Sequence, residues 1–231
     1  MMHGDVQKKL IAYLEQFTTA HKVELIDSVL EKRTRHVTIA LEDIFHGHNI
    51  SAAVRSAEGF GVQDVHIIEQ RHRYAFKNGI DKGASEWLSV QRFDNKAINN
   101  TQACFEYLKN NGYAVVVTSP HAQGYTLDTL PLDKKIALVF GTEQSGATQY
   151  ALENADMHVR VPMYGFTESF NISVCAALCL YDITTRLRKS DVVWQLTEQE
   201  KAAIKLDWLR NIVRGADELE KLFLTQAEVL P

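Results

Sequence analysis

The stretch Lys96–Thr118, K-A-I-N-N-T-Q-A-C-F-E-Y-L-K-N-N-G-Y-A-V-V-V-T, decides the fold class that we predict for this protein. Its first part, up to Asn111, is predicted to be a helix, and Gly112 stands where such a helix would end. The second part, Tyr113–Thr118, is a short apolar run rich in valine, which is typical of a buried strand. A helix followed at once by a buried strand belongs to a βαβ unit, in which the strands run parallel.

Similar apolar runs recur through the middle of the chain, and we predict that each is a strand. They are V-T-I-A-L at 37–41, V-H-I-I at 65–68, W-L-S-V at 87–90, I-A-L-V-F at 136–140 and H-V-R-V at 158–161. Helical segments separate several of these runs. The sequence therefore predicts an α/β protein with a mostly parallel sheet and helices on both faces.

Both ends of the chain are predicted to be helical. The first 35 residues carry apolar side chains at helical spacing, and a late helix begins at Thr197, which forms a capping box with Glu200. Between these ends, the apolar stretch Asn171–Tyr181 predicts a helix buried against the sheet or against a partner subunit. We therefore expect three parts: a helical N-terminal extension (1–35), an α/β core (36–190) and a helical C-terminal extension (191–231).

The composition is that of a soluble globular protein. The chain has 231 residues, of which 45% are hydrophobic and 23% charged, and this excludes a disordered, collagen-like or coiled-coil chain. No apolar run is long enough to span a membrane and the N-terminus lacks a secretory signal, so we expect a cytoplasmic protein. Its three cysteines form no disulfide framework. Because the net charge is −4, any RNA contact must come from local basic patches.

Two glycine-containing segments resemble nucleotide-binding loops. The segment F-G-T-E-Q-S-G at 140–146 follows a predicted strand, but Ala147 and Thr148 stand where a phosphate loop needs lysine and then serine or threonine. We therefore expect no ATP or GTP binding, and a plain turn is the alternative to a ligand-binding loop. The trio Gly59–Gly61 comes at a helix end instead of after a strand, so a dinucleotide fingerprint is not expected and Gly61 is interpreted as a helix stop.

No metal site is expected. Cys175 and Cys179 lie one helical turn apart, but their neighbours are apolar and no third or fourth ligand is near in sequence. His46 and His48 are interpreted as loop residues.

Two further segments could carry chemistry. Asn49–Gly61 is predicted to be a helix that opens with a capping asparagine and carries small residues, and its Arg55 is either a surface residue or an anion binder. Val161–Val174, V-P-M-Y-G-F-T-E-S-F-N-I-S-V, is a strand end, a polar loop and a helix that opens near Asn171. It is either a plain connection or a loop that binds an adenine ring and a methionine tail. In the second case the apolar walls would be Met163, Phe166 and Phe170.

Taken in their order along the sequence, three of these segments resemble the three signature motifs of the SpoU branch of the SPOUT RNA 2′-O-methyltransferases. The first motif is 49–61, the second is 138–146 and the third is 161–174. Phe170 replaces the leucine that is more usual before the asparagine of the third motif, which changes the shape of an adenosine-binding wall more than the chemistry. The resemblance extends over about 34–188.

The resemblance implies S-adenosylmethionine-dependent methylation of a ribose 2′-hydroxyl in RNA. Within the branch the chain is most similar to the TrmH kind, which acts on guanosine 18 in the D-loop of tRNA, and the segment 81–88 is a further cue. The alternatives are a methyltransferase acting on ribosomal RNA and an RNA-binding homologue without activity. The resemblance also implies a C-terminal trefoil knot and a homodimer whose active site is completed across the subunit interface.

The resemblance assigns roles to individual residues. Arg55 would stabilise the developing alkoxide and orient a phosphate, since a guanidinium is a poor base. The remaining catalytic residues would be Asn49, Glu143, Ser169 and Asn171. The methyl donor would be bound by Thr118, Gly141, Val161, Met163 and Phe170. RNA contacts, with a solvated surface charge as the alternative for each, would come from Arg33, Arg35, the run 71–77, Arg186, Arg188 and Lys189.

Overall fold

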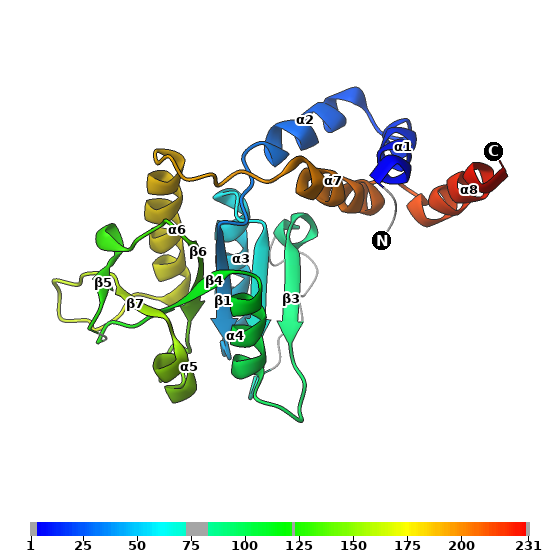
Figure 1. The fold of residues 1–231 in the computed structure, drawn as a ribbon. Helices are drawn as coiled ribbons and strands as arrows, with labels where there is room; N and C mark the ends of the chain where they lie inside the picture. The colour runs from blue at the N-terminus through cyan, green and yellow to red at the C-terminus, as the bar shows by residue number, and fades with distance from the viewer. Residues whose placement is uncertain (1–3, 73–82, 122, 230–231) are drawn as a thin grey trace. The chain divides into compact units, whose positions relative to one another are not determined.

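The structure, a computed structural model, describes residues 4–72, 83–121 and 123–229 (Figure 1). The chain forms two compact units, an α/β unit of residues 34–194 and a helical unit that combines the residues up to 33 with those from 195 onward. Among the described residues, no helix is both long enough and apolar enough to cross a bilayer.

The α/β unit is built on a seven-stranded sheet with the order β3-β2-β1-β6-β4-β7-β5. The pairings between the described strands are all parallel, so the predicted mostly parallel sheet is confirmed. The strands are β1 (Val37–Glu42), β2 (Asp64–Ile68), β3 (Ser89–Phe93), β4 (Tyr113–Thr118), β5 (Tyr125–Thr126), β6 (Lys135–Phe140) and β7 (Met157–Arg160).

Two details of the strands differ from the prediction. The strand expected at 87–90 begins only at Ser89, because the chain before it makes a 3-10 turn (Ala84–Trp87). Strand β5 was not predicted, since two residues are too few to show an alternating pattern. A second 3-10 turn, Leu127–Thr129, follows β5 directly. The trefoil knot stays a prediction.

Helices cover both faces of this sheet (Figure 1). α3 (Gly47–Gly59) and α6 (Ile172–Arg188) pack against each other and share one apolar cluster with the sheet. α4 (Asn100–Asn110) and α5 (Gln149–Asn154) contribute to the cluster on the opposite face. Gly112, predicted to end the helix before β4, has a φ of +81°, the left-handed conformation that favours glycine at a helix end.

The period-two alternation of a strand explains how the central strand β6 supports both faces. Its Ile136, Leu138 and Phe140 belong to the cluster under α3 and α6, whereas Ala137 and Val139 belong to the cluster under α4 and α5. All five side chains are at most 1% exposed. A strand buried on both faces is an unbroken apolar run, as the sequence pattern indicated.

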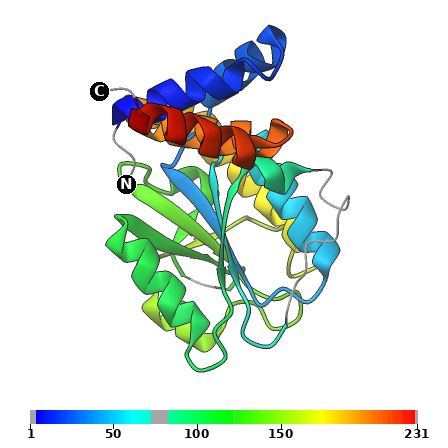
Figure 2. The same ribbon diagram turned by 90° about the vertical axis from the view of Figure 1, so that its right-hand side faces the viewer.

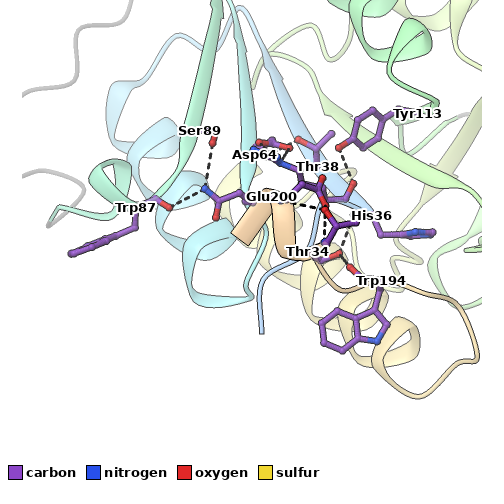
Figure 3. Close-up of polar contacts among 12 residues, drawn as sticks. Thr34, His36, Thr38, Asp64, Trp87, Ser89, Tyr113, Trp194 and Glu200 are labelled. Atoms are coloured by element: carbon purple, nitrogen blue, oxygen red, sulfur yellow. Dashed lines mark hydrogen bonds and ion pairs between the residues drawn. The ribbon is translucent and has the colours of Figure 1, made fainter. Parts of the chain in front are cut away.

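Polar contacts fasten the edge of the sheet where the strands begin (Figure 3). The Thr34 hydroxyl donates to the carbonyl oxygen of Trp194 over 2.6 Å, which joins the first and last residues of the α/β unit. The Thr38 hydroxyl donates to the carbonyl oxygen of Asp64 over 2.6 Å and links β1 to β2. These bonds hold the amino ends of the strands, and the residues predicted to bind the methyl donor lie at the opposite, carboxyl ends.

The helical unit brings the two ends of the chain together (Figure 2). α1 packs against α7 and α8, and α2 packs against α7. The capping box predicted at Thr197 and Glu200 is confirmed, since each side chain accepts from the other residue's backbone N–H. The helices of this unit are α1 (Gly4–Glu15), α2 (Ala20–Leu30), α7 (Glu198–Ile212) and α8 (Ala216–Val229).

Candidate active site

A cavity of about 530 Å³ opens at the carboxyl ends of β4, β6 and β7. Ligands of parallel α/β proteins bind at this edge of the sheet, and the volume lies in the range of small-molecule sites. Its walls come from the loops that follow the three strands. All five residues predicted to hold the methyl donor line it: Thr118, Gly141, Val161, Met163 and Phe170.

The loop after β6 closes tightly on itself. The backbone groups of Thr142 and Gly146 exchange two hydrogen bonds, of 2.8 and 3.0 Å. A Cβ atom on Gly141 would collide with the backbone of Gly146 and Ala147, so a side chain at this position would force the turn open. Glycine at position 141 is therefore a packing requirement, and the closed turn holds Glu143 at the rim of the cavity.

Asn49 does not cap α3, contrary to the prediction. The helix begins two residues earlier, at Gly47, with His46 in the cap position, so Asn49 lies in the first turn and is only 3% exposed. Its side-chain Nδ2 instead donates a 2.7 Å hydrogen bond to Oε1 of Glu143. The asparagine thus joins the first motif to the second.

Asn171 adds the third motif to this contact. Its Nδ2 donates to Oδ1 of Asn49 over 3.3 Å, while its own Oδ1 accepts from the backbone N–H of Ser173 over 2.9 Å and caps α6, the helix predicted to open near this residue. Three residues that lie far apart in sequence therefore form one hydrogen-bonded chain, Glu143–Asn49–Asn171. We call it the polar chain.

The carboxylate at the end of the polar chain is held in its ionised form. Partial burial by itself would raise the pKa of Glu143, but hydrogen bonds from the Asn49 amide and from backbone N–H groups, including that of Phe45, outweigh it. The pKa of Glu143 therefore lies below its ordinary value. At neutral pH the group is an acceptor that fixes the orientation of the Asn49 amide.

Arg55 is the one predicted catalytic residue that stands apart from this assembly. It is exposed on α3, it does not line the cavity, and it forms no hydrogen bond or ion pair with the other described residues. It lies six positions after Asn49, which places the two side chains on different faces of the helix. Ser169 lies in the wall of the cavity. Within one chain the predicted catalytic set is therefore brought together except for Arg55.

Several basic residues proposed as RNA contacts are engaged inside the protein. Arg33 is 1% exposed, and Arg35 pairs with Asp64 over 3.0 Å. The Arg186 guanidinium donates to one carboxylate and to two backbone carbonyl groups. These side chains do not present free charge to RNA. Residues 73–77 of the basic run lie outside the described residues, and the candidates that remain exposed are Arg71, Arg188 and Lys189.

The cavity also contains residues that the sequence analysis did not select. Those after β4 follow that buried strand directly, and this position was the available signal. Cys175, whose sequence neighbours are apolar, lines the cavity as well. In the described part of the chain, no group of three or more His, Cys, Asp and Glu side chains is arranged to hold a metal ion. The additional lining residues include Ser119, Pro120, His121, Arg160 and Glu168.

The fold and the site together define an α/β protein with a small-molecule cavity and a positioned carboxylate at its rim. Residues 36–181 match the model of the family described as the SpoU rRNA Methylase family, which is more than half of the chain. The protein belongs to this family, and the resemblance inferred from the three motifs is confirmed.

Two relatives match over most of both sequences. The tRNA (guanosine(18)-2′-O)-methyltransferase of Borreliella burgdorferi is 37% identical over 221 residues, which cover 96% of this chain and 99% of that protein. The crystal structure of the A. aeolicus TrmH/SpoU tRNA modifying enzyme has a TM-score of 0.72 at 26% identity and covers 84% of this chain and 98% of that one.

A more distant structure shares the fold alone. The AdoMet-bound rRNA methyltransferase from Sinorhizobium meliloti has a TM-score of 0.59 at 19% identity, and it covers 71% of this chain and 60% of that chain.

Proposed function

We propose that this protein transfers the methyl group of S-adenosylmethionine to the ribose 2′-hydroxyl of guanosine 18 in tRNA. The observation that carries the proposal is the polar chain Glu143–Asn49–Asn171 beside a cavity lined by all five residues predicted to hold the donor. The similarity to the B. burgdorferi tRNA methyltransferase over nearly the full length of both proteins supports this substrate.

The chemistry of the cavity fits an adenosine joined to a methionine tail. Met163, Phe170 and Ile172 offer apolar surface for the adenine ring, and the turn that begins at Gly141 offers backbone amides and carbonyls. The Thr118 hydroxyl already donates to the carbonyl oxygen of Val139 over 2.9 Å, so it meets a ligand as an acceptor. When bound, S-adenosylmethionine supplies a methyl group on a positively charged sulfur.

The protein's own residues must orient the ribose and stabilise charge. A 2′-hydroxyl is a weak nucleophile that loses its proton as it attacks. The rate enhancement therefore comes from holding the hydroxyl in line with the methyl group and from stabilising the developing negative charge. The ionised Glu143 fixes the Asn49 amide, and Asn49 in turn fixes the Asn171 amide. We assign the stabilisation of the oxyanion and the binding of a phosphate to Arg55, whose planar guanidinium can donate to two oxygens at once.

The exposed position of Arg55 supports a homodimer. Arg55 does not line the cavity of its own chain, so in the proposed enzyme it completes the cavity of a second copy. α6 carries the exposed side chains Val174, Leu178 and Tyr181 at spacings of four and three residues, which forms an apolar stripe along one side of the helix. An exposed stripe of this kind is suited to a subunit interface.

Mapping the methylated nucleoside tests the proposal. The purified protein, unmodified tRNA and S-adenosylmethionine should yield 2′-O-methylguanosine at position 18, seen by mass spectrometry of nuclease fragments, and tRNA from a deletion strain should lack it. Methylation confined to ribosomal RNA would favour the first alternative, and RNA binding without transfer the second. In calorimetry, S-adenosylmethionine should bind one site per subunit, while ATP and NAD should not bind.

A further inference from the structure

Four aromatic side chains gather where β1 leads into α3. The Phe45 ring lies 4.8 Å from the His46 ring and 5.0 Å from the His72 ring, nearly perpendicular to both, and the His46 ring stacks on the His48 ring at 5.3 Å. We call Phe45, His46, His48 and His72 the aromatic cluster. It belongs neither to the cavity lining nor to the hydrophobic core.

The cluster is held in place but left open to solvent. Phe45 is 62% exposed, although perpendicular contacts on two sides fix its ring. The loop that carries His72 is anchored by Asp43, whose Oδ1 accepts from the backbone N–H groups of Gln70, Arg71 and His72 at 3.1, 2.7 and 2.8 Å. An apolar ring fixed in an exposed position is suited to binding a flat partner.

The cluster also adjoins the polar chain. The backbone N–H of Phe45 donates to Oε2 of Glu143 over 3.3 Å, and the other carboxylate oxygen accepts from Asn49. A group stacked on the Phe45 ring would therefore lie beside the residues that orient the ribose. Arg71, which precedes His72 in the sequence, is an exposed cation and would attract RNA.

We propose that the aromatic cluster stacks on the guanine base of the nucleotide whose ribose is methylated. This inference rests on the proposed function. Unpaired bases of RNA are commonly recognised by stacking on phenylalanine, tyrosine or histidine rings. The base is joined directly to the ribose that the polar chain orients, so base and sugar would occupy neighbouring sites on the same edge of the sheet. The cluster thereby selects an unpaired nucleotide.

Substitutions at Phe45 test the stacking role, because they leave its backbone hydrogen bond to Glu143 in place. Phe45→Leu should lower kcat/KM for tRNA by about 5- to 150-fold, the range expected for losing one base–aromatic stack. Phe45→Trp should retain activity within about threefold, since indole offers a stacking face. S-adenosylmethionine affinity, measured by calorimetry, should not change. Phe17→Leu is the matched control, because Phe17 is 48% exposed in the helical unit.

A double-mutant cycle, which combines a protein variant with a modified tRNA, separates stacking from a structural role of Phe45. Single-turnover rates would be measured for wild type and Phe45→Leu on tRNA with guanine 18 present and on tRNA with an abasic ribose there. If the ring stacks on this base, Phe45→Leu slows transfer to intact tRNA but adds little to the loss already caused by the abasic site. If the two losses multiply, the ring does not contact the base and the inference is wrong.

Failure of this inference is distinguishable from failure of the proposed function. If wild type does not methylate guanosine 18, the proposed function fails and the inference with it. If wild type methylates guanosine 18 and Phe45→Leu does so equally well, only the inference fails. Light scattering on Phe45→Leu completes the test, because dissociation to monomers would show that the ring packs against a second copy of the chain and would overturn the stacking role.

Discussion

The Asn49 side-chain amide donates a 2.7 Å hydrogen bond to Oε1 of Glu143, across 94 positions of sequence. The bond links the first turn of α3 to the closed turn after β6, and the asparagine is almost completely buried. A buried amide that loses its charged partner is left unsatisfied, and a carboxylate that loses the amide is left less well oriented. The two side chains therefore act as a unit.

Asn49→Ala and Glu143→Ala should each slow methyl transfer by about 10- to 150-fold, which corresponds to a hydrogen bond to a charged group of roughly 1.5–3 kcal/mol. The double variant should be little slower than the worse single variant, since either change removes the same interaction. Single-turnover assays would measure this coupling. Gln102→Ala and Glu106→Ala are matched controls, because their exposed 2.9 Å pair lies on α4. Additive losses at Asn49 and Glu143 would contradict the shared role.

Gly141→Ala should weaken S-adenosylmethionine binding by about tenfold or more, a loss of about 1.4 kcal/mol. The added Cβ would collide with the backbone of Gly146 and Ala147, so the closed turn must shift and distort the cavity. Calorimetry measures the affinity. Gly165→Ala is the matched control, since a Cβ atom there meets nothing within 4 Å. Unchanged affinity in Gly141→Ala would show that the turn does not shape the donor site.

Much of the fold was predictable because it follows from short-range patterns. Doubly buried strands such as β6 are unbroken apolar runs, and Gly112 and Thr197 mark a helix end and a helix start by local rules. The residues predicted to bind the methyl donor could be found only through the family motifs. A residue such as Thr118 or Met163 does not by itself indicate a ligand-binding role.

The contacts between motifs were not predictable from local rules. Asparagine favours helix caps, and Asn49 was therefore interpreted as one, whereas a tertiary hydrogen bond to Glu143 overrides that preference. Phe45 was overlooked because a single phenylalanine in a loop has no periodic signal. Its significance lies in the rings of His46 and His72, which only the fold brings to it.

Acid should destabilise the protein through His66. This side chain is 3% exposed beside Phe93 and Tyr107, neither ring nitrogen has a hydrogen-bond partner, and burial lowers its pKa from 6.5 to about 4. The unfolded chain takes up the proton near pH 6.5 and the folded chain only near 4, so stability falls as the pH drops between these values, by roughly 3 kcal/mol.

His66→Phe should remove this part of the acid sensitivity while preserving the aromatic packing. Denaturant unfolding at a series of pH values would measure the slope of the free energy of unfolding against pH. His21→Phe, on the exposed surface of α2, is the control and should leave the slope unchanged. An identical slope in wild type and His66→Phe would assign the acid sensitivity to other groups.

Arg55→Ala should abolish methyl transfer to tRNA while S-adenosylmethionine binding stays nearly intact, because Arg55 does not line the cavity. Arg55→Lys should also fail, since an ammonium lacks the planar fork that binds two oxygens at once. The loss should appear in the single-turnover rate, as expected for a contact that strengthens in the transition state. If either variant transfers at close to the wild-type rate, Arg55 is a surface residue and not a catalytic one.

Mixing two impaired variants tests whether Arg55 serves the cavity of a second copy. In a heterodimer of Arg55→Ala and Glu143→Ala, one cavity has both variant residues, and the other combines an intact Glu143 with an intact Arg55 from the neighbouring chain. After co-refolding in equal amounts, about half the dimers are mixed and each has one intact site, so about a quarter of wild-type activity should return. The matched mixture of Asn49→Ala with Glu143→Ala should gain nothing over the low activity of the separate variants, because these two residues bond within one chain. Inactivity of the Arg55 mixture, with mixed dimers verified by mass spectrometry, would place Arg55 in the site of its own chain or outside the reaction.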